Sequence, residues 1–227
     1  MKDTELFNNS REKLRTLKDV SLIDSDELSL LEWYVYETDS LHKDMYEKEV
    51  SYISGQDIES ESYNDSGLIA ISYFLKRTRY SHVIYLASLG ERVLNDSCDK
   101  LADVLGENLI FNLQELSGKT WTKERKFLER YGNFVIPDKI WNNFSAIYVI
   151  RNVLVHENGK VNALFDNERE LLRKKYSSMN GIDVEGNEIV IERIFIEDSI
   201  KAVNVIIQFL DEKLGEIIER SIKPKLV

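Results

Sequence analysis

The sequence predicts an all-α protein: a helical bundle with a small β-hairpin before its last helix and an extra helical arm at its N-terminus. Three observations lead to this fold class. The 227 residues include only two prolines and ten glycines, so few positions interrupt a helix. Apolar residues recur every three or four positions over long stretches and make up 43% of the chain, enough for a sizeable core. A single segment, residues 181–197, has the composition of paired strands.

The first predicted helix runs from Asp24 to about Ile53. Asp24 followed by Glu27 resembles a capping box in which aspartate replaces the usual Ser or Thr, and Gly55 favours a helix end. This helix carries three neighbouring aromatic residues, which we expect to pack in a core rather than to stack on bases, because the segment is acidic: Trp33, Tyr34 and Tyr36.

The polar stretch 54–67 marks the predicted boundary between an acidic helical arm, residues 1–63, and the bundle, residues 64–227. The arm holds 16 acidic and 7 basic residues, whereas the bundle holds 24 and 23. The net charge of −10 therefore lies almost wholly in the arm, and the near-neutral bundle is open to phosphate binding. Basic clusters in the bundle, which are also typical of solvated helix faces, are Lys76-Arg77-Arg79, residues 119–130 and Arg173-Lys174-Lys175.

The helical pattern of the bundle begins with residues 68–105, where a break is expected near Tyr80 and an end at Gly106. A short helix is predicted at residues 123–131. Together these segments supply the first two helices of the bundle.

The next helix follows Pro137, where Asp138 is placed to cap it, and Asn158-Gly159 ends it. Its apolar side chains predict deep burial, and they are Ile140, Trp141, Phe144, Ile147, Tyr148 and Val153.

The end of the chain combines the predicted hairpin with the most regular helix. Residues 184–189 are expected to form the hairpin tip, and residues 190–196, rich in β-branched side chains, the second strand. The last helix keeps a three-and-four spacing of apolar residues over about five turns. These residues are Ile200, Val203, Ile207, Leu210, Leu214 and Ile217.

Simple counts exclude several classes of protein. One cysteine, Cys98, leaves no internal disulfide or cysteine-based zinc site, and we expect it to be buried. The three histidines lack a metal-ligand spacing and no glycine-rich phosphate loop occurs, so we expect neither a metal nor a cofactor. No apolar run approaches the ~18–20 residues of a membrane span, and the N-terminus is too polar for a signal peptide. A soluble cytoplasmic protein with no membrane partner is therefore predicted.

The stretch RNVLVHENG, residues 151–159, places Arg151, Asn152 and His156 at the end of an apolar helix. At 100° per residue, Arg151 lies about 20° from Phe144 on the core-facing stripe, where a guanidinium needs a partner or a polar cleft. Asn152 lies about 40° from His156 and can steady its imidazole. Arg151 and His156 lie about 140° apart. They converge only if the helix loosens at its end, or if Arg151 meets the histidine of a second chain.

RNVLVH fits the R-x4-6-H signature of the HEPN domains, which are small all-α bundles, and Asn152 matches a polar residue common after the arginine in that family. The chain resembles this family over roughly residues 68–217. The family pattern places an acidic residue on an earlier helix of the bundle. For that role the resemblance implies Glu91, which would hold Arg151.

The resemblance implies RNA cleavage, because active members of the family are metal-independent endoribonucleases. His156 would act as general base or acid at a ribose 2′-hydroxyl, whose oxygen attacks the adjacent phosphate and leaves a 2′,3′-cyclic phosphate. Arg151 would stabilise the extra negative charge, and Asn152 would orient the histidine or contact the phosphate. Family members usually dimerise with their motifs facing each other, so RNA and a homodimer with a composite site are the expected partners. A toxin or anti-phage defence role, with an antitoxin or defence partner, is a further expectation of the resemblance.

Two other interpretations stay open. In the first, His156 is stabilised by the helix C-terminal dipole and Arg151 pairs with Glu91, so both are structural. The protein is then a non-catalytic helical dimer that binds a nucleotide or a protein partner. In the second, the acidic arm mimics nucleic acid and occupies the cleft of its own or another chain.

Overall fold

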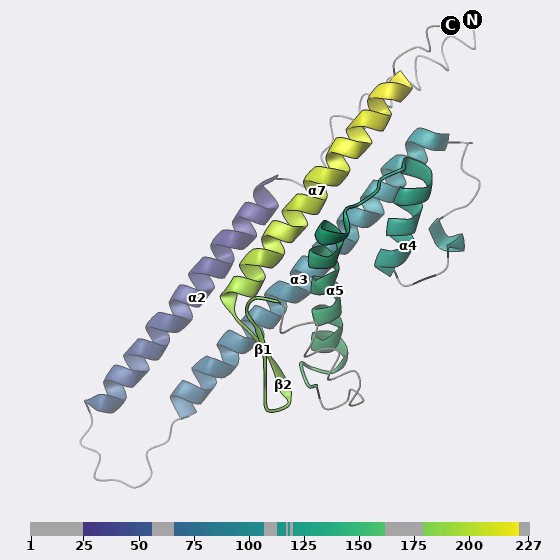
Figure 1. The fold of residues 1–227 in the computed structure, drawn as a ribbon. Helices are drawn as coiled ribbons and strands as arrows, with labels where there is room; N and C mark the ends of the chain where they lie inside the picture. Colours follow the sequence, from purple (N-terminus) through teal and green to yellow (C-terminus); the bar gives the residue numbers. More distant parts are fainter. Residues whose placement is uncertain are drawn as a thin grey trace, which may run out of the picture. The chain divides into compact units, whose positions relative to one another are not determined.

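The computed structural model describes residues 25–55, 66–106, 113–116, 118, 120–161 and 179–222. It confirms the predicted all-α class with a hairpin before the last helix (Figure 1). In chain order the elements are α2 (Ser25–Ser54), α3 (Ser66–Leu105), η2 (Leu113–Glu115), α4 (Thr120–Phe127), η3 (Leu128–Gly132), α5 (Asp138–His156), β1 (Ile182–Glu185), β2 (Glu188–Ile191) and α7 (Arg193–Ile222). No helix among these described residues is long and apolar enough to cross a membrane.

The chain divides into two compact units, and α3, α5 and α7 contribute residues to both. The first comprises Asp26–Ala87 and Ile147–Lys201, and we call it the hairpin unit because it holds β1 and β2. The second comprises Met1–Ser25, Ser88–Ala146 and Ala202–Val227, and we call it the α4 unit.

In the hairpin unit, α2 and the first part of α3 form an antiparallel pair of helices. The Tyr34 ring meets the His82 ring edge-on, with centroids 5.4 Å apart, and Arg79 forms an ion pair with Asp39 at 2.6 Å. Later residues of α2 therefore contact earlier residues of α3, as expected for antiparallel helices. The inward face of α2 is apolar, and its buried side chains are Leu28, Leu31 and Val35.

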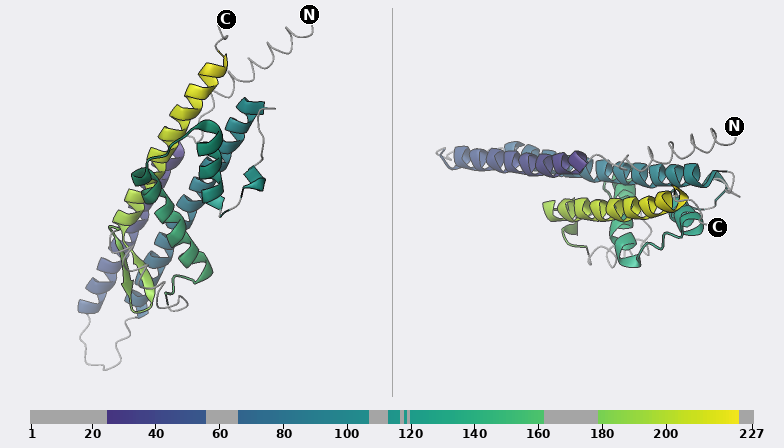
Figure 2. Two further views of the ribbon diagram at one scale, coloured as in Figure 1. Left: turned by 45° about the vertical axis from the view of Figure 1, so that its right-hand side comes forward. Right: turned by 90° about the horizontal axis from the view of Figure 1, so that it is seen from above.

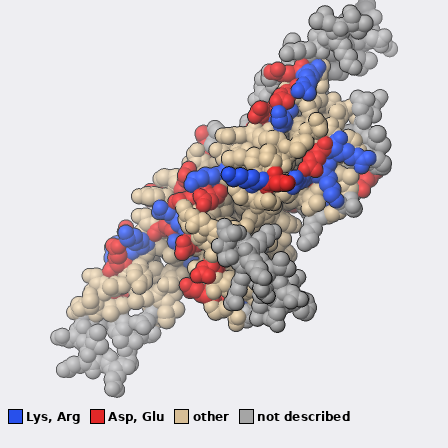
Figure 3. Space-filling model, viewed as in Figure 1, with Lys and Arg blue, Asp and Glu red and all other residues tan. Residues whose placement is uncertain are grey.

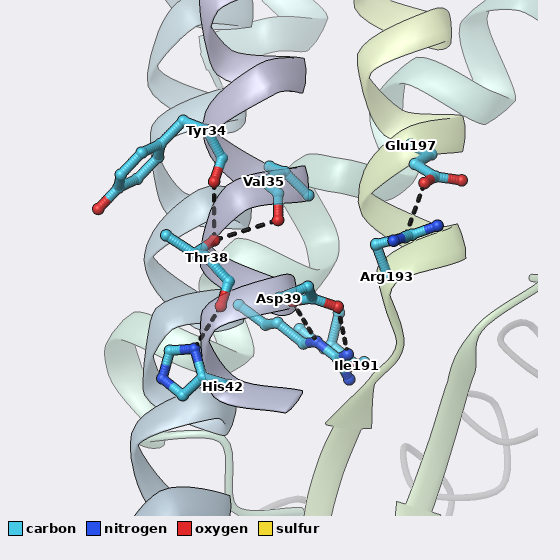
Figure 4. Close-up of polar contacts among 9 residues, drawn as sticks. Tyr34, Val35, Thr38, Asp39, His42, Ile191, Arg193 and Glu197 are labelled. Carbon is cyan, nitrogen blue, oxygen red and sulfur yellow. Dashed lines mark hydrogen bonds and ion pairs between the residues drawn. The ribbon is translucent and has the colours of Figure 1, made fainter. Parts of the chain in front are cut away.

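Arg79 also links this helix pair to the hairpin. Its Nε and Nη2 atoms donate to the Asp39 carboxylate, and Nη1 donates to the carbonyl of Ile191 at 3.0 Å. Figure 4 shows Asp39 of α2 facing Ile191 at the end of β2. Both charged side chains are largely shielded from solvent, so this charge-assisted contact is stronger than an exposed ion pair.

The hairpin pairs β1 with β2 antiparallel, with Ile182 opposite Ile191. Gly186 turns the chain with a φ of +59°, a conformation that glycine adopts without steric cost. Tyr80 of α3 donates a 2.5 Å hydrogen bond to the carbonyl of Ile189, so the hairpin is held on α3 by a buried tyrosine.

The α4 unit is built around stacked aromatic rings. Trp121 of α4 stacks on Phe144 of α5 with centroids 4.3 Å apart, and a Cβ at Gly90 of α3 would lie within about 3 Å of both rings. Only a glycine allows α3 to approach this closely. The apolar stripe predicted for the last helix is buried within this unit at Val203, Ile207, Leu210 and Leu214.

Two predictions of local structure were wrong. No break occurs near Tyr80, since α3 runs without interruption from Ser66 to Leu105 (Figure 2). The strand predicted to reach residue 196 ends at Ile191, and α7 begins at Arg193. The β-branched residues that follow are helical because Phe195 and Ile196 pack into the core from α7.

The aromatic residues Trp33, Tyr34 and Tyr36 do not pack in a core as predicted, since they are 60%, 51% and 57% exposed. Asp24, most of the stretch 54–67 and the cluster Arg173-Lys174-Lys175 lie outside the described residues. The division into an arm, residues 1–63, and a bundle, residues 64–227, stays a prediction for the same reason.

Candidate functional site

The end of α5 carries the predicted motif. The helix is regular from Asp138 to His156, and the N–H groups of Glu157 and Gly159 both bond the carbonyl of Val153 at 3.1 Å. This arrangement closes the helix directly after His156. The imidazole of His156 is exposed to solvent on the last turn. A general base must reach its substrate, and this position permits that.

Arg151 and Asn152 are half-buried on the same helix, one turn before its end. Arg151 Nη1 donates a 3.0 Å hydrogen bond to Asn152 Oδ1, so the amide oxygen accepts from the guanidinium. The role of Asn152 in orienting His156 stays a prediction.

Arg151 and His156 do not converge within one chain. Because α5 keeps helical geometry through both residues, their side chains leave the axis about 140° apart. Loosening of the helix, one of the two ways they could meet, is therefore not present in this chain. The other way, across two chains, stays a prediction.

Glu91, the acidic residue implied for holding Arg151, lies on α3 in the α4 unit. Its charge acts on Glu124 of α4, whose pKa it helps to raise. Arg151 belongs to the hairpin unit, and its pairing with Glu91 stays a prediction.

A further cation, which is not part of the motif, lies at the end of α5. Arg77 Nη1 donates a 2.6 Å hydrogen bond to Oδ1 of Asn158, two residues after His156. Its guanidinium lies over the rings of Tyr73 and Tyr80, at 5.0 and 5.6 Å from their centroids. The basic cluster that contains Arg77 is visible in the sequence. Asn158, the hydrogen-bond partner of Arg77, lies 81 residues further along the chain.

The backbone after α5 is held in place by the hairpin. Ile189 donates to the carbonyl of Gly159 at 2.9 Å, and Val161 donates to the carbonyl of Asn187 at 2.7 Å. Gly159 has a φ of +78°, and a Cβ there would meet the Tyr80 ring at under 3 Å. A glycine at this position therefore allows α5 to end against α3.

The positive charge beside this site is partly balanced. Lys76 pairs with Glu188 of β2, and this contact lowers the pKa of the Glu188 carboxyl. On the face shown in Figure 3, the Lys and Arg side chains of described residues lie among Asp and Glu side chains rather than in a separate basic surface. A phosphate contact on this face would therefore be local and depend on a few cations.

A second titratable group of note lies in the α4 unit. Glu124 is buried and its Oε2 atom has no hydrogen-bond partner among the described residues. Burial raises its pKa to about 7, and the charge of Glu91 adds to that increase. Burial also raises the pKa of the Cys98 thiol, which was correctly expected to be a buried residue.

The geometry thus defines an all-α protein with an exposed histidine and a nearby arginine where a buried helix ends against a hairpin. No protein-family model, curated protein or solved structure matches this chain.

Proposed function

We propose that this protein is a metal-independent, cytoplasmic endoribonuclease of the HEPN type, which cleaves RNA by attack of a ribose 2′-hydroxyl and leaves a 2′,3′-cyclic phosphate. The observation that carries the proposal is the exposed His156 on the last turn of α5, with Arg77 bonded to Asn158 directly beyond it. An accessible imidazole can serve as general acid or base in this reaction, and guanidinium groups can contact the phosphate.

In the proposed reaction, His156 accepts the proton of the 2′-hydroxyl or donates one to the departing 5′-oxygen. Arg151 stabilises the additional negative charge on the phosphorus centre, and Asn152 either orients His156 or contacts the phosphate. Since Arg151 and His156 point apart on α5, the proposal requires a homodimer in which each chain supplies one of them to a shared site. RNA is the substrate because DNA lacks the 2′-hydroxyl.

The test is cleavage of a panel of single-stranded and structured RNAs in the presence of EDTA. We expect His156→Ala to lower the rate at least 100-fold, within the range that general acid–base catalysis contributes. His42→Ala is the matched control, because His42 lies on α2 and bonds the Thr38 carbonyl of its own helix. Wild-type protein that leaves every RNA intact, or equal rates for wild type and His156→Ala, would reject the proposal.

A second candidate is a non-catalytic helical dimer that binds a nucleotide or a protein partner. The mixed charges in Figure 3 and the exposed aromatic residues of α2 favour it. It is preferred if the protein binds RNA or a protein without cutting RNA. A toxin or anti-phage role, with an antitoxin or defence partner, rests on the family resemblance and is proposed only together with the nuclease.

A further inference from the structure

An apolar stripe on α2 is left uncovered by the described part of the chain. It consists of large side chains that are between 43% and 63% exposed: Leu30, Tyr34, Leu41, Met45 and Tyr52. At 100° per residue all five lie within about 60° of one another around the helix. Trp33, which is 60% exposed, flanks them. Figure 4 shows Tyr34 and Asp39 pointing to different sides of α2, so the stripe does not face the hairpin.

The stripe runs straight along the helix. Leu30, Leu41 and Tyr52 are eleven residues apart, which is three helical turns with little angular drift. It spans about 33 Å at 1.5 Å per residue. A largely apolar line of this length on an exposed helix is typical of a surface that packs against another helix.

Leu30 and Tyr52 are placed symmetrically about Leu41, whereas Tyr34 and Met45 have the charged residues Lys48 and Glu37 at their mirrored positions. Leu30 and Tyr52 each lie eleven residues from Leu41, and Tyr34 and Lys48 each lie seven. Two copies of α2 packed antiparallel about Leu41 would place Leu30 against Tyr52 and Tyr34 against Lys48. A two-fold interface requires this kind of self-complementarity, whereas an unrelated partner does not.

The charged residues within the stripe favour the same orientation. Glu37 and Lys48 lie on its line. In a parallel pair Glu37 would face Glu37 and Lys48 would face Lys48. In the antiparallel pair Lys48 lies over Tyr34 of the other copy and within one turn of its Glu37, which gives a cation–π contact and an ion pair.

The charge of α2 also favours a protein partner over a lipid surface. Helix α2 contains eight acidic residues and two lysines, so an anionic membrane would repel it. Aromatic side chains bury about 150–250 Å² each, and the half-exposed stripe with Trp33 offers on the order of 600 Å² per chain, against about 800 Å² in a standard interface. The stripe supplies most of such an interface, and adjoining surface would complete it.

We propose that the exposed stripe of α2 is a homodimer interface, in which α2 packs antiparallel against α2 of a second copy with Leu41 at the two-fold axis. The interface contains none of Arg151, Asn152 and His156, so it would exist in a non-catalytic protein as well. If the protein is the proposed nuclease, the same two chains must also bring Arg151 and His156 together in one site.

The first test is the mass of the purified full chain by sedimentation. Wild type is expected at twice the chain mass of 26.5 kDa, and Leu41→Glu at the monomer mass. Val135→Glu is the control, because Val135 is an exposed apolar residue outside α2 and should not change the wild-type mass. Far-UV circular dichroism of each variant shows whether its helices are intact. A Leu41→Glu variant that remains dimeric would overturn the interface while leaving the nuclease proposal untouched.

The second test is orientation by disulfide cross-linking with an added oxidant. The native Cys98 is buried, so an introduced thiol on α2 is the accessible one. Leu41→Cys should link to itself, and Leu30→Cys should link to Tyr52→Cys in a mixture but not to itself. Self-linking of Leu30→Cys would indicate a parallel pair and contradict the proposal.

A monomeric wild-type chain would also overturn the proposed interface. Two further measurements would then identify what occupies the stripe. If deleting residues 1–24 exposes Leu41→Cys to maleimide, the chain's own N-terminal segment occupies the stripe. If the protein sediments with anionic vesicles instead, the stripe binds a lipid surface.

Discussion

Arg77 of α3 and Asn158, just beyond the end of α5, are joined by a 2.6 Å hydrogen bond between Nη1 and Oδ1. The contact brings a guanidinium to the end of the helix whose last residue is His156. Two tyrosine rings, those of Tyr73 and Tyr80, lie against the same guanidinium. A cation held in this way can contact a phosphate without losing much side-chain freedom on binding.

If this cation contacts RNA, Arg77→Gln should weaken binding of a short single-stranded RNA and lower the salt dependence. One lost phosphate contact on a single strand corresponds to a decrease of about 0.7 in the slope of log K against log salt. Fluorescence anisotropy at several salt concentrations measures that slope. Arg220→Gln is the control, because Arg220 is an exposed arginine at the far end of α7. Equal effects of the two substitutions would mean that Arg77 adds only general positive charge.

The ion pair between Arg79 and Asp39 should contribute measurably to stability. We expect Asp39→Ala to lower the free energy of unfolding by about 2 kcal/mol, between the values for exposed and fully buried pairs, because Arg79 keeps its bond to Ile191. Lys43→Ala is the matched control, since its pair with Glu47 is exposed and 3.8 Å long, and it should cost less than about 0.5 kcal/mol. Urea unfolding of the three proteins gives the comparison, and equal midpoints for the two variants would contradict it.

Glu124 should make the protein less stable as the pH rises from about 4.5 toward neutrality. Its folded pKa of about 7 lies above the ordinary value of 4.5, so between these values the folded chain holds a proton that the unfolded chain has released. Stability from this group is therefore full below about pH 4.5, is lost progressively between about pH 4.5 and 7, and changes little above that, by on the order of 3 kcal/mol in all.

Glu124→Gln removes this titration and should flatten the dependence of unfolding free energy on pH between 5 and 8. Thermal or urea unfolding at several pH values measures it. Glu115→Gln is a suitable control, because Glu115 is an exposed glutamate of the same unit. A wild-type profile as flat as that of Glu124→Gln would show that Glu124 ionises normally in the fold.

Two glycines with positive φ should differ in their tolerance of a side chain. Gly186→Ala adds a methyl group where no atom lies within 4 Å, so only the backbone conformation is penalised, by about 1 kcal/mol. Gly159→Ala adds the same methyl group against the Tyr80 ring and should cost roughly 2 kcal/mol more. Denaturant midpoints of both variants test the difference. Similar values would mean that Tyr80 moves away freely.

Much of the fold could be predicted because helical periodicity is a local property. The 3,4 spacing of the last helix matches burial at Val203, Leu210 and Leu214, and Asp138 does begin α5. The hairpin was placed correctly before the last helix, but its second strand was extended too far. β-branched residues suit both a strand and a buried helix, and packing within α7 selected the helix.

The candidate site was predicted in part. The sequence could indicate Arg151, Asn152 and His156, because they lie within one short motif on one helix. It could not indicate that Arg77 reaches Asn158, since that contact joins residues 81 positions apart.

Local spacing in the sequence was enough to establish most of the helical segments and that one histidine closes an apolar helix. Burial could not be established in this way, as Tyr34 and Trp33 illustrate: they look like core residues but are solvent-exposed on α2. The reason is physical. Periodicity describes one helix at a time, whereas burial and polar contacts depend on which distant segments pack against it. A buried tyrosine, Tyr80, thus finds its acceptor 109 residues away in a hairpin.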